Sequence, residues 1–223
     1  MLKLLKIDSL VRDQHHYLEH TDSCYFVFEY TARGGFSYSD GNNFVINYKK
    51  SVGRKGNPAE YQHKTNAINR AATILSSMSK NWPLEIFLFV PVPPSKLKSD
   101  PLYDDRLVQT LELASNQLGG KLIYKELVIQ TVSTTPSHQS EDGQRLSPSE
   151  HLEAYISSTT EQSDESINII IFDDVITTGS HFKAMQSFLI TLYPNANFIG
   201  LFFARRALGS NFEGFDIIDD VQL

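Results

Sequence analysis

Apolar residues occur along this chain in two alternating patterns, short unbroken runs and longer stretches with helical spacing. The unbroken runs predict strands that are buried on both faces, and they cover residues 86–90, 169–172 and 198–203. Between them, apolar residues recur at intervals of three and four, which predicts helices with one buried face. These helices cover residues 59–78, 104–118 and 182–192. Strands that alternate with amphipathic helices predict an α/β fold with a central, mainly parallel sheet flanked by helices.

The N-terminal part has a different pattern. Residues 24–31 and 43–48 are rich in aromatic and β-branched residues, and glycines and Asp40-Gly41-Asn42 lie between them. This pattern predicts a β-hairpin with a long loop. Its aromatic side chains could stack on a base, but burial in a core is their usual role and is favoured here. We expect one compact domain, in which residues 1–80 form an N-terminal unit that packs on a core of residues 81–223.

Composition and charge narrow the classes of function. The net charge is −6 and the sequence pI is about 5.6, which argues against a broad nucleic-acid-binding surface. The single cysteine, Cys24, excludes an internal disulfide and a cysteine-based zinc site. Residues 1–6 lack the apolar core of a signal peptide, and no apolar run is long enough to span a membrane. We therefore expect a soluble, cytoplasmic protein with no membrane partner.

The strongest chemical signal follows the apolar run at residues 169–172. Two carboxylates, Asp173 and Asp174, end this strand, and a polar turn with Gly179 leads into the next helix. Unpaired backbone N–H groups at a helix start favour an anion, above all phosphate, and glycine allows close approach. Carboxylates accept hydrogen bonds from vicinal hydroxyls and can hold Mg²⁺ directly or through water. Together these features describe a site for a ribose 5-phosphate.

An apolar strand, Asp-Asp, two residues and Thr-Thr-Gly also resemble the motif of type I phosphoribosyltransferases that binds phosphoribosyl pyrophosphate (PRPP). The resemblance implies that Asp173 and Asp174 hold the ribose, with Mg²⁺ as the cofactor, and that the following loop wraps the 5-phosphate. The implied PRPP contacts are Asp173, Asp174, Val175, Ile176, Thr177, Thr178, Gly179, Ser180 and His181. His181 stands where the family usually has a hydroxyl residue, so it either donates to phosphate or indicates weaker or altered binding. The alternative is a solvated Asp-Asp turn that merely caps a helix.

A proline-rich loop follows the first strand of the predicted core. It resembles the Pro-Val-Pro loop of ComF-like members of the same family, in which this loop contacts pyrophosphate. The resemblance implies pyrophosphate contacts by Val92, Pro93, Pro94, Ser95, Lys96 and Arg106. Proline has no N–H group, so Val92, Ser95 and Lys96 would supply any backbone donors. The likeness to ComF is partial, because the four N-terminal zinc-binding cysteines are absent and residues 103–107 replace an Arg-Gly-Phe-Asn-Gln run.

Residues 131–150 are polar and contain few apolar side chains, which is typical of a lid or a disordered segment. The resemblance places the family's mobile catalytic loop here, with His138, Gln139 and Arg145 as candidate residues. The alternative is an ordinary solvated surface loop. Farther upstream, residues 16–20 formally match a short H-x-x-E-H zinc motif, but no third ligand stands out. A surface segment is the favoured interpretation there.

The resemblance implies a phosphoribosyltransferase that transfers the ribose 5-phosphate of PRPP to a nitrogen nucleophile, a nucleobase or an amine, and releases pyrophosphate. Asp173, Asp174 and Arg145 would be catalytic, and Asp173 and Asp174 would hold Mg²⁺. The N-terminal hairpin and first helix would form part of a hood that selects the base, and many relatives pair as homodimers. The alternative is a non-catalytic regulator with the same fold that senses PRPP or a nucleotide or binds a partner.

Overall fold

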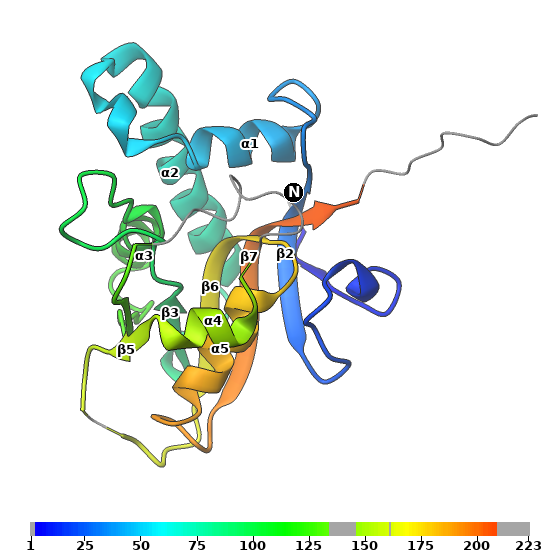
Figure 1. Cartoon of the computed structure of the whole chain (residues 1–223), viewed down its shortest axis with the longest axis vertical. Coiled ribbons are helices and arrows are strands. Elements are labelled where there is room, and N and C mark those ends of the chain that lie inside the picture. Colours follow the sequence, from blue (N-terminus) through cyan, green and yellow to red (C-terminus); the bar gives the residue numbers. More distant parts are fainter. Residues whose placement is uncertain (1–2, 134–145, 161, 209–223) are drawn as a thin grey trace, which may run out of the picture.

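The computed structural model describes residues 3–133, 146–160 and 162–208 and shows an α/β fold. Its main sheet has five strands in the order β1-β2-β7-β6-β3. Four of them run parallel, and β1 pairs antiparallel with β2 at one edge. Figure 1 shows α4 and α5 in front of this sheet, while α1 and α2 lie toward its upper left. The expected architecture, a mainly parallel sheet flanked by helices, is confirmed.

The elements have the following bounds. The main sheet contains β1 (Leu5–Lys6), β2 (Ser23–Thr31), β3 (Phe87–Pro91), β6 (Asn168–Ile176) and β7 (Asn197–Ala207). A second, antiparallel pair is formed by β4 (Val128–Gln130) and β5 (Tyr155–Ser157). The α-helices are α1 (Asp40–Tyr48), α2 (Pro58–Ser79), α3 (Arg106–Gln117), α4 (Pro148–Glu153) and α5 (Ser180–Leu189). Short 3-10 turns cover Arg12–Gln14, Val52–Gly56 and Leu84–Ile86.

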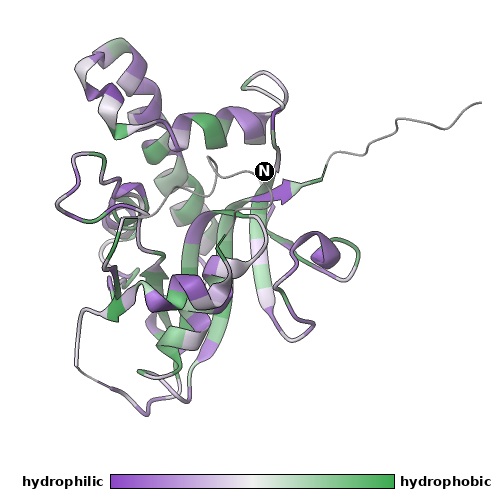
Figure 2. Cartoon of the chain, in the orientation of Figure 1, coloured by the Kyte–Doolittle hydropathy of each residue, from purple (hydrophilic) through white to green (hydrophobic). Residues whose placement is uncertain are grey.

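Strand β6 runs through the centre of the core. Its apolar run, residues 169–172, is fully buried, because β3 and β7 flank it and helices cover the sheet. Figure 2 shows the apolar colour concentrated in these strands. Pro91 of β3 is in register with Phe172 of β6, so both strands reach the same edge of the sheet together. The proline-rich loop and the Asp-Asp pair therefore emerge side by side.

The predicted N-terminal hairpin is wrong. Residues 24–31 do form a strand, but residues 43–48 belong to helix α1. The side chain of Ser39 caps this helix by accepting a hydrogen bond from the N–H of Asn42 at 3.0 Å, and Phe44, Val45 and Tyr48 share its buried face. The segment is short and its aromatic and β-branched residues favour strands, so its helical spacing did not distinguish it from a strand. Strand β2 lies within the main sheet, and the division of the chain at residue 80 stays a prediction.

The other predicted strands and helices are present as β3, β6, β7, α2, α3 and α5. Strand β4 is short, and a bridge between Tyr124 and Phe89 precedes it. Among the described residues, no helix is both long enough and apolar enough to cross a membrane.

Candidate functional site

A cavity of about 330 Å³ opens at the carboxyl ends of β3 and β6. Ligands of open α/β sheets bind at this edge. The residues predicted from the sequence that line it are Val92, Pro93, Pro94, Ser95, Lys96, Arg106, Asp173, Asp174, Val175, Ile176, Thr177, Gly179, Ser180 and His181. Thr178, which was also predicted, is not among the lining residues, and three other candidates, His138, Gln139 and Arg145, lie outside the described residues. The structure thus brings the two predicted loops and Arg106 together around one space.

The loop after β6 presents backbone donors. Gly179 caps α5 with a φ of +86°, a left-handed conformation that glycine adopts without strain. Within the described part of the chain, the N–H groups of Thr178, Gly179 and His181 donate to no protein acceptor. The hydroxyls of Thr178 and Ser180 lie 3.3 Å apart beside them. Such a group of donors at a helix start is suited to an anion.

The N-terminal segment holds this loop from outside the sheet. The imidazole Nδ1 of His15 bonds the carbonyl oxygen of Thr177, and the N–H of Tyr17 donates to the carbonyl of Thr178 at 2.9 Å. His15 is buried, and burial lowers its pKa, although the bond to Thr177 acts in the opposite direction. A methyl group added at Gly179 would meet the side chain of Leu18 at 3.0 Å. No local sequence pattern links this segment to the loop, because His15 and Thr177 are 162 residues apart.

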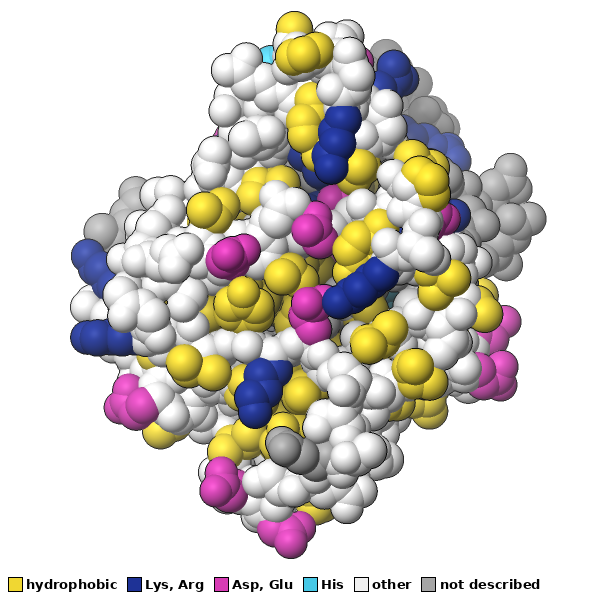
Figure 3. Space-filling model, turned by 90° about the vertical axis from the view of Figure 1, so that its left-hand side faces the viewer, with side chains coloured by type: hydrophobic (Ala, Val, Ile, Leu, Met, Phe, Trp, Pro, Cys, Tyr) yellow, Lys and Arg dark blue, Asp and Glu magenta, His cyan; other side chains and the backbone are white. Residues whose placement is uncertain are grey.

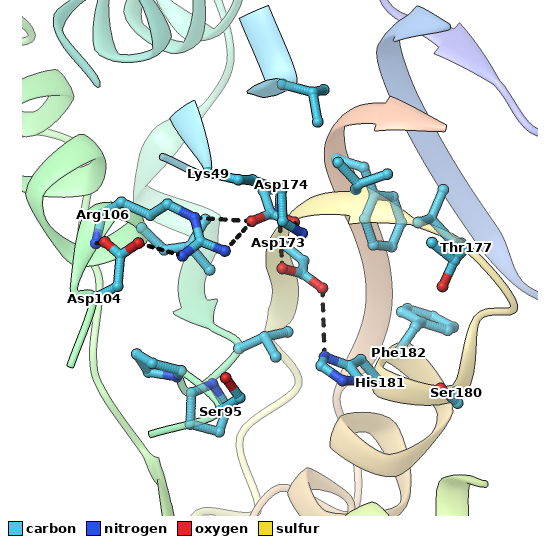
Figure 4. A pocket seen from close by; sticks show the side chains of 18 of the residues that line it. Lys49, Ser95, Asp104, Arg106, Asp173, Asp174, Thr177, Ser180, His181 and Phe182 are labelled. Atoms are coloured by element: carbon cyan, nitrogen blue, oxygen red, sulfur yellow. Dashed lines mark hydrogen bonds and ion pairs between the residues drawn. The ribbon is translucent and has the colours of Figure 1, made fainter. Parts of the chain in front are cut away.

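The two adjacent carboxylates have different surroundings. The side chain of Asp174 is 4% exposed, and Oδ1 accepts a hydrogen bond from Lys49 Nζ at 2.9 Å. Its Oδ2 accepts from Arg106 Nε at 2.9 Å and from Nη2 of the same guanidinium (Figure 4). Burial alone would raise the pKa of Asp174, but Arg106 and Lys49 hold it well below its usual range. Asp174 is therefore ionised, and each of its oxygens has a cationic partner.

Asp173 keeps one oxygen toward the cavity. Oδ1 accepts the N–H of Asp174 at 2.7 Å, whereas Oδ2 lies 3.7 Å from Nδ1 of His181. Figure 4 shows this carboxylate pointing toward His181 at the start of α5. The ring of His181 meets that of His151, from α4, edge to face with centroids 4.1 Å apart. Burial and the nearby His181 lower the pKa of His151 to about 3, so it is neutral at pH 7.

Arg106 is fixed from behind by a second charged cluster. Its Nη1 donates to Asp104 Oδ2 at 2.8 Å, and Lys64 Nζ donates to the same oxygen at 2.7 Å. The guanidinium carbon also lies 5.8 Å from the centre of the Tyr48 ring. Burial lowers the pKa of Lys64 to about 8, although the charge of Asp104 opposes this shift. Lys64 and Asp104 thus make Arg106 part of a continuous chain of charges that ends at Asp174 and Lys49.

Lys49, Lys64, Asp104 and His151 are site residues that the sequence analysis missed. One of them left a signal. Lys64 precedes the apolar positions Ala67 and Ile68 by three and four residues, which places it on the buried face of α2. A lysine on an apolar face requires a partner. Lys49 directly follows α1 in a polar segment, and no local pattern indicates its role.

Other basic residues near the site have separate roles. Lys98 pairs with Glu126 at 3.2 Å, and the guanidinium of Arg205 bonds Gln14 at 2.9 Å and also Glu29. The N–H of Val92 donates to the carbonyl of Phe172 at 2.9 Å and so continues the sheet. The expectation that Val92 supplies a backbone donor for pyrophosphate is therefore wrong.

The family resemblance implies Mg²⁺, an ion that prefers oxygen ligands. Among the described residues, no three histidine, cysteine or acidic side chains gather so that they could hold a metal by themselves. Oδ2 of Asp173 faces the cavity, whereas both oxygens of Asp174 are occupied by Lys49 and Arg106. Mg²⁺ commonly binds one or two carboxylates and completes its shell with substrate oxygens and water. The residues fit the ion in this mode, with Asp173 as the protein ligand.

The cavity collects positive charge on an acidic chain. Lysine and arginine contribute four lining residues, and aspartate contributes three. The basic residues are Lys49, Lys96, Arg106 and Arg206, and the acidic residues are Asp104, Asp173 and Asp174. Lys64 adds a further cation behind them. Figure 3 shows acidic and basic side chains close together among apolar ones on the face to the left of Figure 1. The whole chain carries a net charge of −6.

No family model matches this chain, and no curated protein is significantly similar to it in sequence.

Proposed function

We propose that this protein is a phosphoribosyltransferase of the type I family that transfers the ribose 5-phosphate of PRPP to a nitrogen nucleophile and releases pyrophosphate. The observation that carries the proposal is the shared cavity. A loop with unpaired N–H groups, a carboxylate and a set of cations surround one space at the carboxyl edge of parallel strands. PRPP has a phosphate, a diol and a diphosphate that correspond to these three features.

Each part of the cavity would bind one part of PRPP. The N–H groups of Thr178, Gly179 and His181 would hold the 5-phosphate, and Asp173 Oδ2 would accept hydrogen bonds from the ribose hydroxyls. The loop at residues 92–96 and the cations opposite it would hold the diphosphate. Bound Mg²⁺ would supply charge neutralisation on the departing oxygens.

The chemistry requires positioning and charge stabilisation. The bond between ribose C1 and the diphosphate oxygen breaks, the acceptor nitrogen forms its bond to C1, and the ring passes through a cation-like state. Cations that hold the departing group favour this state, and a closed cavity excludes water as a competing nucleophile. The role of Arg145 as a catalytic residue is part of this proposal, as is a homodimer.

Calorimetric titration of PRPP with Mg²⁺ tests the proposal. We expect binding to the wild type and at least a tenfold loss in Asp173→Asn, with Asp40→Asn as a control that changes the net charge equally outside the cavity. Pyrophosphate release is then measured with a panel of nucleobases and amines. Absence of PRPP binding by folded wild type would refute the proposal.

A second function, a non-catalytic sensor of PRPP or a nucleotide, is favoured by one observation. Both oxygens of Asp174 accept hydrogen bonds from Lys49 and Arg106, so within the Asp-Asp pair only Asp173 has a carboxylate oxygen that accepts no hydrogen bond from the described residues. A sensor would bind PRPP but release no pyrophosphate with any acceptor. The calorimetric and release assays together distinguish the two functions.

A further inference from the structure

Two cations from distant parts of the chain converge on Asp174. Lys49 directly follows α1 and Arg106 begins α3, yet both contact the same buried carboxylate. The side chains of Lys49 and Arg106 are 20% and 17% exposed, whereas that of Asp174 is 4% exposed. All three line the cavity. A solute in the cavity can therefore reach the cations from the open side, while Asp174 holds them from the buried side.

We infer that Lys49 and Arg106 form a binding site for a diphosphate group, and that the carboxylate of Asp174 competes for these cations when no ligand is bound. The choice of a diphosphate rests on the proposed function. The competition itself follows from the contacts. Each cation directs its donors to a carboxylate oxygen, and the donors that bind a carboxylate also bind phosphate oxygens.

Arg106 is anchored so that it can exchange this partner without moving away. One edge of the guanidinium, Nη1, is fixed by Asp104, which Lys64 holds in turn. The ring of Tyr48 lies against the same group, and its hydroxyl bonds Thr110 on α3 at 2.7 Å. The other edge, Nε and Nη2, faces Asp174. Only that second edge has to change partners when an anion enters.

The competing carboxylate favours a multivalent anion. Asp174 is attached to the same fold as its cations, so its effective concentration beside them is very high. A ligand with a single negative charge gains little by replacing it. A diphosphate carries more charge, spans more than one cation, and also meets Lys96 of the proline-rich loop in the same cavity. The site therefore selects a diphosphate over acetate or chloride.

Replacing Asp174 at the cations leaves a buried carboxylate that needs other donors. The hydroxyls of a ribose are such donors, and in PRPP they belong to the same molecule as the diphosphate. A ligand with both groups can take over the cations and satisfy Asp174 in one event. Pyrophosphate alone leaves Asp174 without its partners and binds more weakly for that reason.

Calorimetry with inorganic pyrophosphate in EDTA tests the competition without any metal. We expect Asp174→Asn to bind pyrophosphate about tenfold more tightly than wild type or better, since the competing charge is gone. Asp40→Asn is the matched control, because Asp40 pairs with Arg70 at an exposed site and its loss changes the net charge equally. Adding Lys49→Gln to Asp174→Asn should remove the gain.

Equal or weaker pyrophosphate binding by folded Asp174→Asn would overturn the inference. If that variant does not fold, Lys49→Gln alone decides the question. A severalfold loss of pyrophosphate affinity in Lys49→Gln supports the site, and an unchanged affinity overturns it. If PRPP with Mg²⁺ does not bind wild type, the proposed function is refuted instead. The pyrophosphate titrations then still show whether Asp174 competes with an anion for Lys49 and Arg106.

Discussion

The neighbouring carboxylates Asp173 and Asp174 should differ sharply in what they contribute to stability. Asp174→Asn removes the charge that Lys49 and Arg106 share and turns an amide group toward two cations. Removing one partner of a buried ion pair typically costs about 3–5 kcal/mol. Because both cations are partly exposed to water, we expect the lower end, about 3 kcal/mol. Asp173→Asn keeps the oxygen that accepts the N–H of Asp174 and should cost no more than about 1 kcal/mol.

Urea unfolding followed by far-UV circular dichroism measures both costs. If the unfolding free energy of each variant has the same slope against urea concentration as that of wild type, the transitions can be compared. A double-mutant cycle with Lys49→Met should give a coupling of about 1–2 kcal/mol between Lys49 and Asp174. Asp173 and Lys49 provide the control cycle, with a coupling near zero. Equal costs for the two asparagine variants, or no coupling between Lys49 and Asp174, would refute the assignment of Asp174 to this cluster.

Three further predictions concern other residues around the cavity. The pKa of Lys64 is lowered to about 8 from 10.5, so between these pH values the unfolded chain binds more protons than the folded protein. The unfolding free energy of wild type should therefore rise across this window by up to about 3 kcal/mol relative to that of Lys64→Met. No such difference is expected if Lys64 is solvated. The pKa of His151 is lowered to about 3 from 6.5. As the pH falls from 6.5, wild type should therefore lose stability relative to His151→Gln by about 1.4 kcal/mol per pH unit. If the unfolding free energies of the two proteins change in parallel with pH, His151 is not buried as a neutral group. Gly179→Ala places a Cβ at positive φ against Leu18 and should cost more than about 1 kcal/mol in urea unfolding, whereas Gly56→Ala, at a position with open space, should change stability much less.

The fold was predictable to the extent that local periodicity determines it. The run at residues 169–172 lies in the buried strand β6, and the run at residues 86–90 lies in β3 except for Ile86, which ends the preceding turn. Helix α2 follows its three-and-four spacing. Helix α1 was missed because residues 43–48, four of which are aromatic or β-branched, form a segment too short for its periodicity to separate a helix from a strand. Its N-terminal cap at Ser39 was the available signal.

The site was predictable in its loops and unpredictable in its charges. The Asp-Asp pair and the proline-rich loop meet because both follow parallel strands, which sequence order and strand pattern already indicate. Lys49 and Arg106 reach Asp174 across 125 and 68 residues, respectively. No local pattern encodes such pairs, because they depend on where the helix ends lie relative to the sheet. The same applies to the contact of His15 with Thr177.

The contacts of Asp174 link the stability of the chain to its affinity for anions. The charge that stabilises the cluster with Lys49 and Arg106 is also the charge that a diphosphate has to replace. Asp174→Asn should therefore lower the unfolding free energy and raise pyrophosphate affinity in the same variant, as expected where a binding site retains strained or competing charges. If stability and affinity fall together, Asp174 only positions the cations and does not compete with the ligand. Opposite signs of the two changes are the result that competition requires, and neither local unfolding of the cavity nor a nonspecific change in net charge produces them.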